Sequence, residues 1–175
     1  MKPEVFNFER KRKRINDVLT GYFERVLRVD PKLRNDEKTR TGMLAFLREL
    51  GPGRNMMFEK IKDPSDATRW FVDEKSSRTE THGHASSQNS EDVKNDKYRG
   101  CIAYHIDGKV IHSTISGMLG SEDALAAVIQ MSEHAEVTVD EVIDNVKAHD
   151  GQLPEEFFQE GHYLKEILDE CRSVE

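Results

Sequence analysis

Gly100–Gly117 reads GCIAYHIDGKVIHSTISG, two runs rich in apolar and β-branched residues on either side of Asp107-Gly108. An Asp-Gly pair between such runs is typical of a two-residue β-hairpin turn. This turn fixes the register, because it places Ile106 opposite Lys109 and every later pair follows from that one. The stretch therefore predicts an antiparallel hairpin in which each side chain is assigned to one of two faces.

One face of this hairpin is apolar and the other carries reactive side chains. The apolar face holds Ile102, Tyr104, Ile111 and Ile115. The opposite face holds Cys101, His105, His112 and Thr114. Two imidazoles and a thiol suit acid–base chemistry or a zinc site. We therefore take Cys101, His105 and His112 as the candidate catalytic residues, against the alternative that they are ordinary sheet residues.

Composition limits the class of protein. A chain of 175 residues is long enough for one domain with a proper core, and 36% hydrophobic content argues against wholesale disorder. No apolar run approaches the roughly 18 residues of a membrane span, so we expect no membrane partner. No secretory signal is apparent, and the two cysteines lie 70 positions apart, which favours a reduced, cytoplasmic setting.

The net charge of −7 conceals a division between the two halves of the chain. Residues 1–78 hold 19 Lys and Arg against 13 Asp and Glu, a balance of +6. Residues 79–175 hold 7 against 20, a balance of −13. This asymmetry indicates an anionic partner for the first half or pairing between the halves, although each half could simply have a solvated surface of its own sign.

Five consecutive cations stand near the start of the chain. They are Arg10, Lys11, Arg12, Lys13 and Arg14. We take them as candidate partner-binding residues, for an acidic protein surface, including the second half of this chain, or for nucleic acid. Consecutive residues spread around a helix, and no aromatic residues alternate with them, so the pattern also fits a solvated helix end.

The first half of the chain predicts two helices and a hairpin. Apolar residues recur every three or four positions over 8–28 and again over 36–50, which indicates amphipathic helices. Turn residues near Asp63-Pro64 then separate two expected strands, 55–62 and 68–75. A short helix capped by Asp63 is the competing interpretation of this turn.

The segment 76–98 predicts a flexible polar loop, because Val93 is its single aliphatic residue larger than alanine. It contains His82 and His84, a His-x-His pair that is a candidate metal site, although no further ligands lie nearby in the sequence. The other interpretation is that both histidines are ordinary loop residues.

The last third predicts three acidic helices after the hairpin. One starts near Ser121, one at Thr138 with Glu141 as a capping box, and one at Leu153-Pro154. The predicted fold class is α+β, with a small antiparallel sheet of about four strands in two hairpins, packed against N-terminal and C-terminal helices. We expect one sheet face to be left uncovered by helices.

We expect three segments within one compact domain. Residues 1–75 form a basic helical segment plus a hairpin, 76–98 the polar loop, and 99–175 the second hairpin plus three helices. Catalytic and nucleotide-binding motifs are absent from the sequence, and no cofactor is expected. The leading hypothesis is a non-enzymatic regulatory protein that acts through protein–protein contacts as a homodimer. The alternatives are a metal-dependent or histidine-based hydrolase centred on the 100–117 hairpin, and a nucleic-acid-binding protein using the basic helix.

Overall fold

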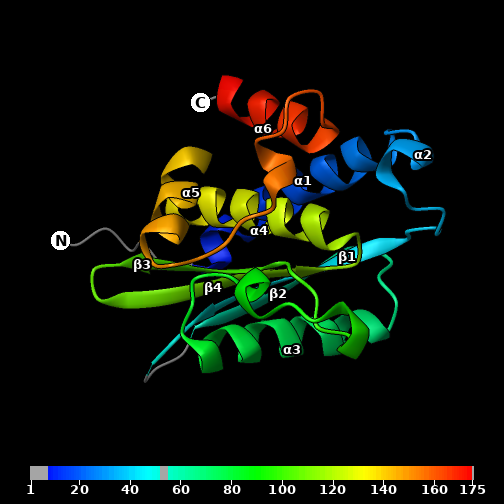
Figure 1. The fold of residues 1–175 in the computed structure, drawn as a ribbon. Helices are drawn as coiled ribbons and strands as arrows, with labels where there is room; N and C mark the ends of the chain where they lie inside the picture. The colour runs from blue at the N-terminus through cyan, green and yellow to red at the C-terminus, as the bar shows by residue number, and fades with distance from the viewer. Residues whose placement is uncertain (1–7, 52–54, 175) are drawn as a thin grey trace.

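A computed structural model describes residues 8–51 and 55–174, the first three of them by their backbone alone. Its core element is one antiparallel sheet with strand order β2-β1-β4-β3 (Figure 1). The strands are β1 (Gly42–Glu49), β2 (Met56–Lys62), β3 (Cys101–Ile106) and β4 (Lys109–Ser116). The helices are α1 (Phe8–Leu27), α2 (Pro31–Arg34), α3 (Ala67–His82), α4 (Gly120–Ala135), α5 (Val139–Ala148) and α6 (Tyr163–Ser173). The predicted α+β class is confirmed.

The hairpin of β3 and β4 has the predicted register. Ile106 pairs with Lys109 and Cys101 with Thr114. Asp107 at φ +50° and Gly108 at φ +73° form the turn, a backbone conformation that an Asp-Gly pair supplies readily. The predicted division of side chains between two faces is therefore confirmed as well.

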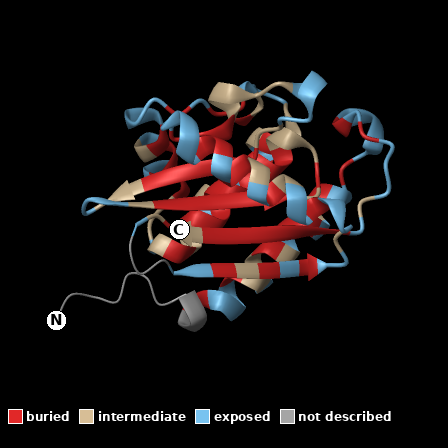
Figure 2. Ribbon diagram, turned by 90° about the horizontal axis from the view of Figure 1, so that it is seen from below, coloured by how far each residue is buried: buried red, intermediate tan, exposed pale blue. Residues whose placement is uncertain are grey.

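Helices cover both faces of the sheet. Figure 1 shows α1, α4, α5 and α6 on one side and α3 on the other. The main core lies under the first group, where Leu19, Ile111 and Leu125 are fully buried. Buried residues run along most of the sheet, exposed residues gather at turns and outer helix faces (Figure 2), and the edge strand β2 alternates between exposed and buried residues. The expectation of an uncovered sheet face was wrong, because α3 occupies that face.

The predicted helix over 36–50 was wrong, because most of this stretch forms strand β1. Residues Gly42–Glu49 are almost all buried, since helices pack on both faces of this central strand. A strand buried on both sides loses the alternation of apolar and polar residues. A continuous apolar run of that kind can also be read as helix.

The second strand of the predicted first hairpin was wrong, and so was the start of the loop predicted after it. The expected strand 55–62 is present as β2, but 68–75 and the first part of 76–98 form α3. The sheet-facing side of α3 includes Lys75, Ser76 and Thr79, all at 1% exposure. Because these residues are polar, the helix shows no apolar stripe in the sequence.

The remainder of 76–98 is held in place by Arg78. Its guanidinium donates to the carbonyl oxygens of Ser87 at 2.6 Å, Ser90 at 2.9 Å and Tyr98 at 2.5 Å. The same side chain pairs with Glu74 one turn earlier in α3. One buried side chain therefore provides hydrogen-bond donors for three backbone carbonyl oxygens of a segment that has almost no apolar residues of its own.

Replacing Arg78 by lysine should release this segment, because an ammonium cannot reproduce the planar fork of five donors. We expect the free energy of unfolding to fall by about 2 kcal/mol. Backbone amides of residues 85–98 should exchange hydrogen faster than those of the sheet. Arg69→Lys, an exposed arginine of the same helix, is the matched control. Equal exchange in both variants would contradict this role of Arg78.

The helices after the hairpin follow the prediction more closely. Thr138 and Glu141 form the predicted capping box at the start of α5. The last helix begins later than predicted, at Tyr163 and not near Leu153. Gly161 at φ +79° belongs to the turn that precedes it.

Candidate functional site

Cys101, His112 and Thr114 share the predicted face of the hairpin, but α3 covers them. Cys101 is 0% exposed and His112 is 1% exposed. The Thr114 hydroxyl donates to Cys101 Sγ at 3.0 Å, and Ser76 Oγ of α3 lies 3.1 Å from His112 Nδ1. These side chains pack against a helix, and none of them faces solvent as a catalytic group would.

Burial also sets the protonation of these groups. It raises the pKa of the Cys101 thiol, so the thiolate is disfavoured. It lowers the pKa of His112 to about 3, with the positive charge of Arg48 acting in the same direction. His105 lies apart, with its ring stacked on His149 at 3.8 Å between centroids. The structure therefore does not bring Cys101, His105 and His112 together in one catalytic site.

Three of the five cations in the basic run form ion pairs within the chain. Lys11 is buried, and its ammonium lies 3.3 Å from Glu136 at the end of α4. Arg12 pairs with Glu59 of β2, and Arg14 pairs with Glu133 of α4. Lys13 is exposed, and the side chain of Arg10 lies outside the described residues. The basic run therefore binds in part to the acidic second half of its own chain.

His82 and His84 are both exposed, His82 as the last residue of α3. In the described part of the chain, no three His, Cys, Asp or Glu side chains lie close enough to hold a metal ion. Within residues 8–51 and 55–174, no helix has the length and apolar character needed to cross a bilayer.

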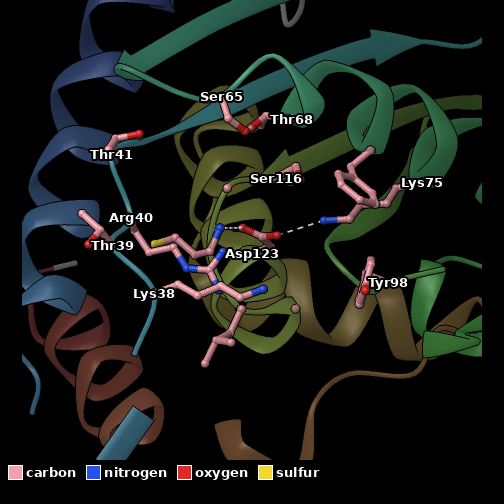
Figure 3. Close-up of a pocket in the computed structure, with 16 residues that line it drawn as sticks. Lys38, Thr39, Arg40, Thr41, Ser65, Thr68, Lys75, Tyr98, Ser116 and Asp123 are labelled. Carbon is pink, nitrogen blue, oxygen red and sulfur yellow. Dashed lines mark hydrogen bonds and ion pairs between the residues drawn. The ribbon is translucent and has the colours of Figure 1, made fainter. Parts of the chain in front are cut away.

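A pocket of about 350 Å³ lies between the start of α3 and the start of α4 (Figure 3). We call it the Lys75 pocket. It is lined by Lys38, Thr39, Arg40, Phe71, Tyr98 and Ser116 around Lys75 and Asp123. Lys75 Nζ lies 2.9 Å from Asp123 Oδ2 and 2.8 Å from the carbonyl oxygen of Ile115. Both charged side chains are at most 3% exposed.

Desolvation dominates the electrostatics of this ion pair. Burial raises the pKa of Asp123 to about 6, although the charge and the hydrogen bond of Lys75 act to lower it. The other carboxylate oxygen, Oδ1, accepts a hydrogen bond from the Met118 amide at 3.0 Å. Asp123 therefore joins the strand-to-helix turn after β4 to the lysine of α3.

Two glycines allow the chain segments around this ion pair to pack closely, because they have no Cβ atom. A Cβ on Gly100, which has φ +123°, would lie 2.9 Å from Lys75 Nζ and 2.7 Å from Asp123 Cβ. A Cβ on Gly117 would lie 2.4 Å from the carbonyl oxygen of Gly42. Both glycines are needed for this approach, so the pocket depends on chain segments that are distant in sequence.

A second ion-pair network lies beside the pocket, at Glu122, the residue of α4 that precedes Asp123. Arg34 donates to both oxygens of Glu122, at 2.6 and 2.9 Å. Asp36 lies between Arg34 and Arg40, and Tyr163 donates to Glu122 at 3.0 Å. These contacts hold three parts of the chain around the first turn of α4: α2, the segment that precedes β1, and the start of α6.

An aromatic row leads outward from the Lys75 pocket. The Tyr98 and Phe71 rings meet edge-on at 5.5 Å, and Phe71 meets Trp70 edge-on at 4.9 Å. Phe71 and Tyr98 are half-buried in the pocket wall, whereas Trp70 is 56% exposed on α3. The row connects a polar pocket with an exposed tryptophan.

Sequence reasoning missed the Lys75 pocket. The sequence predicts a helix that starts near Ser121, which places Asp123 in its first turn, and it places Lys75 in the expected strand 68–75. The two residues are 48 positions apart, and no local motif joins them. Gly100 and Gly117, which bound the predicted hairpin, are the signal that could have indicated close packing here.

Comparisons with known proteins do not assign this chain to a family. This chain matches no protein-family model, no curated protein and no solved structure.

Proposed function

We propose that this protein is a non-enzymatic regulatory protein that acts through protein–protein contacts, and that its first partner is a second copy of the chain. Trp70 carries the proposal. It is the chain's one tryptophan, and it is 56% exposed on the outer side of α3. Tryptophan is enriched at the centres of protein interfaces, where its burial contributes much of the binding energy.

The contact surface that we propose is the Trp70 surface, the exposed side of α3. It consists of Asp66, Arg69, Trp70, Asp73 and Ser77. α3 contacts the sheet mainly through its opposite side (Figure 1), although the Arg69 guanidinium also lies 3.9 Å from the centre of the Phe58 ring of β2. The surface is thus available to a partner, and its apolar centre is surrounded by polar residues, as in many interfaces.

The charges on the Trp70 surface favour a second copy as the partner. Arg69 and Asp73 lie one helical turn apart, 3.3 Å from each other and both more than half exposed. In an antiparallel pair of α3 helices related by a two-fold axis, Arg69 of each copy would face Asp73 of the other. Such self-complementarity is what an isologous dimer requires. The Trp70 rings would then lie close to the axis.

The test is the oligomeric state as a function of concentration. We expect the mass measured by sedimentation equilibrium to rise from the 20.1 kDa of one chain toward roughly twice that value. Trp70→Ala should weaken self-association roughly tenfold or more. The emission of Trp70 in the unmodified protein should shift to shorter wavelength as the dimer forms.

Two controls make this test specific. Leu33→Ala removes another exposed apolar side chain, 71% exposed on α2, and should leave the dimer intact. Arg69→Asp and Asp73→Arg should each weaken the dimer, whereas the double variant should restore it. A mass that stays at one chain at all concentrations would refute the proposal. Equal effects of Trp70→Ala and Leu33→Ala would also refute it.

A further inference from the structure

We infer that the Lys75 pocket binds a small organic anion. Its carboxylate or phosphoryl oxygens would be held by Lys75 and Ser116 at the inner end, while Lys38 adds positive charge at the mouth. Its apolar part would lie against Phe71 and Tyr98. This inference goes beyond the proposed dimer, since the pocket is formed within one copy of the chain.

Lys75 has a donor to offer at the inner end of the pocket. An ammonium carries three N–H donors, and two of them are used by Ile115 and Asp123. The third remains for an oxygen of a ligand. Because the side chain is 2% exposed, a hydrogen bond made here is weakly screened by water.

Ser116 supplies a second donor at the same end. The residue is 5% exposed and lines the pocket, and its hydroxyl makes no hydrogen bond with any described residue. The Ser116 hydroxyl oxygen is not fully shielded from solvent, so it is accessible from the pocket. A buried hydroxyl left in this state is ready to bind a polar group of a ligand.

The charges around the pocket favour an anion. Asp123 is compensated by Lys75, and Arg40 is compensated by Asp36. Lys38 lies exposed at the mouth, and no ion pair connects its ammonium with another described residue. The balance is therefore one positive charge, at the end where an anion would enter.

Size and shape limit the ligand. A volume of about 350 Å³ is at the lower end for small-molecule pockets, which indicates a compact metabolite. The half-buried rings of Phe71 and Tyr98 form an apolar wall on which a planar or aliphatic group can pack. An anion that carries such a group fits the pocket better than a bare ion does.

Three probes test the inference by isothermal titration calorimetry on the full chain: inorganic phosphate, phenyl phosphate and benzoate. We expect phenyl phosphate or benzoate to bind roughly tenfold more tightly than inorganic phosphate, because the ring adds contact with the apolar wall. The tighter of the two identifies the group as phosphoryl or carboxylate. Failure of all three to bind would overturn the inference.

Matched variants locate the binding. Lys38→Gln and Ser116→Ala should each weaken the better probe several-fold, whereas Lys94→Gln, an exposed lysine that does not line the pocket, should not. Unchanged binding in both pocket variants would overturn the assignment. Lys75 is not substituted here, because its loss would leave Asp123 buried without a partner.

The same calorimetry separates this inference from the proposed dimer. Trp70→Ala should bind the probes as tightly as the unmodified protein, since Trp70 does not line the pocket. In the unmodified protein, Trp70 emission should respond to the ring of the probe through Phe71. A monomeric protein that binds the probes would refute the dimer alone. A dimer that binds none would refute the pocket alone.

Discussion

Replacing Arg34 by methionine should lower the free energy of unfolding by about 3–5 kcal/mol. The side chains of Arg34 and Glu122 are 3% and 0% exposed, and two parallel hydrogen bonds join them. Removing the arginine leaves the Glu122 carboxylate buried without its cation. That uncompensated charge is the main physical cost, because the pair itself gains little over an apolar contact.

The surroundings of Glu122 make relief by rearrangement difficult. Its oxygens also accept hydrogen bonds from the Tyr163 hydroxyl and the Leu119 amide. Burial and the negative charge of Glu122 raise the pKa of Tyr163, so this tyrosine stays a neutral donor. The carboxylate is therefore fixed at the start of α4 by donors from several elements.

Urea unfolding of a graded series measures this effect. Arg34→Lys keeps the charge but loses the fork, and should cost less than Arg34→Met. Arg25→Met is the matched control, because its pair with Glu170 is solvent-exposed and should contribute less than about 1 kcal/mol. Similar losses for Arg34→Met and Arg25→Met would show that the buried network does not stabilise the fold.

Local turn chemistry is the part of this fold that the sequence predicts best. The β3–β4 hairpin and the α5 capping box each depend on residues a few positions apart. Their conformations follow from backbone preferences and short-range hydrogen bonds, which distant segments do not reverse. The register of β3 and β4 was predictable for this reason, together with the division of their side chains.

β1 was predicted as a helix because it is a central strand that is buried on both faces. Met43 and Leu47 pack on the main core, whereas Leu44 and Phe46 pack with Val72 of α3 on the opposite face. A strand that is apolar on both sides has no period of two. Its identity as a strand depends on a helix that follows it, and that helix was itself not predicted.

Long-range polar pairing explains why α3 and the Lys75 pocket were missed. Ser76 faces His112 and Lys75 faces Asp123, at separations of 36 and 48 residues. A helix whose buried side is polar looks like a loop until its partners are known. The reactive-looking side of the β3–β4 hairpin is therefore explained by α3, which supplies the complementary groups.

Acidification should destabilise the protein, because two of its histidines are buried as neutral imidazoles. Burial lowers the pKa of His112 to about 3 and that of His134 to about 4, with Lys11 contributing at His134. In the unfolded chain both would bind protons below about pH 6.5. Their contribution to stability is thus present at neutral pH and is lost as the pH falls from about 6.5 toward 4.

Asp123 opposes this loss. Its pKa is raised to about 6 in the folded protein, above the value of about 3.9 expected when unfolded. The folded state therefore binds a proton at Asp123 before the unfolded state does, which stabilises the fold as the pH falls through 6. At 1.36 kcal/mol per pKa unit, the two histidines together lower the free energy of unfolding at pH 4.5 by about 5 kcal/mol relative to neutral pH. Asp123 raises it by about 2 kcal/mol.

We therefore expect urea unfolding at pH 4.5 to give a free energy about 3 kcal/mol lower than at pH 7. His134→Gln should reduce this difference, because the variant has one fewer imidazole to protonate on unfolding. His82→Gln, which removes an exposed histidine, should keep the pH dependence of the unmodified protein. If His134→Gln left the difference unchanged, His134 would not be held neutral by burial, and the acid sensitivity would have to arise elsewhere.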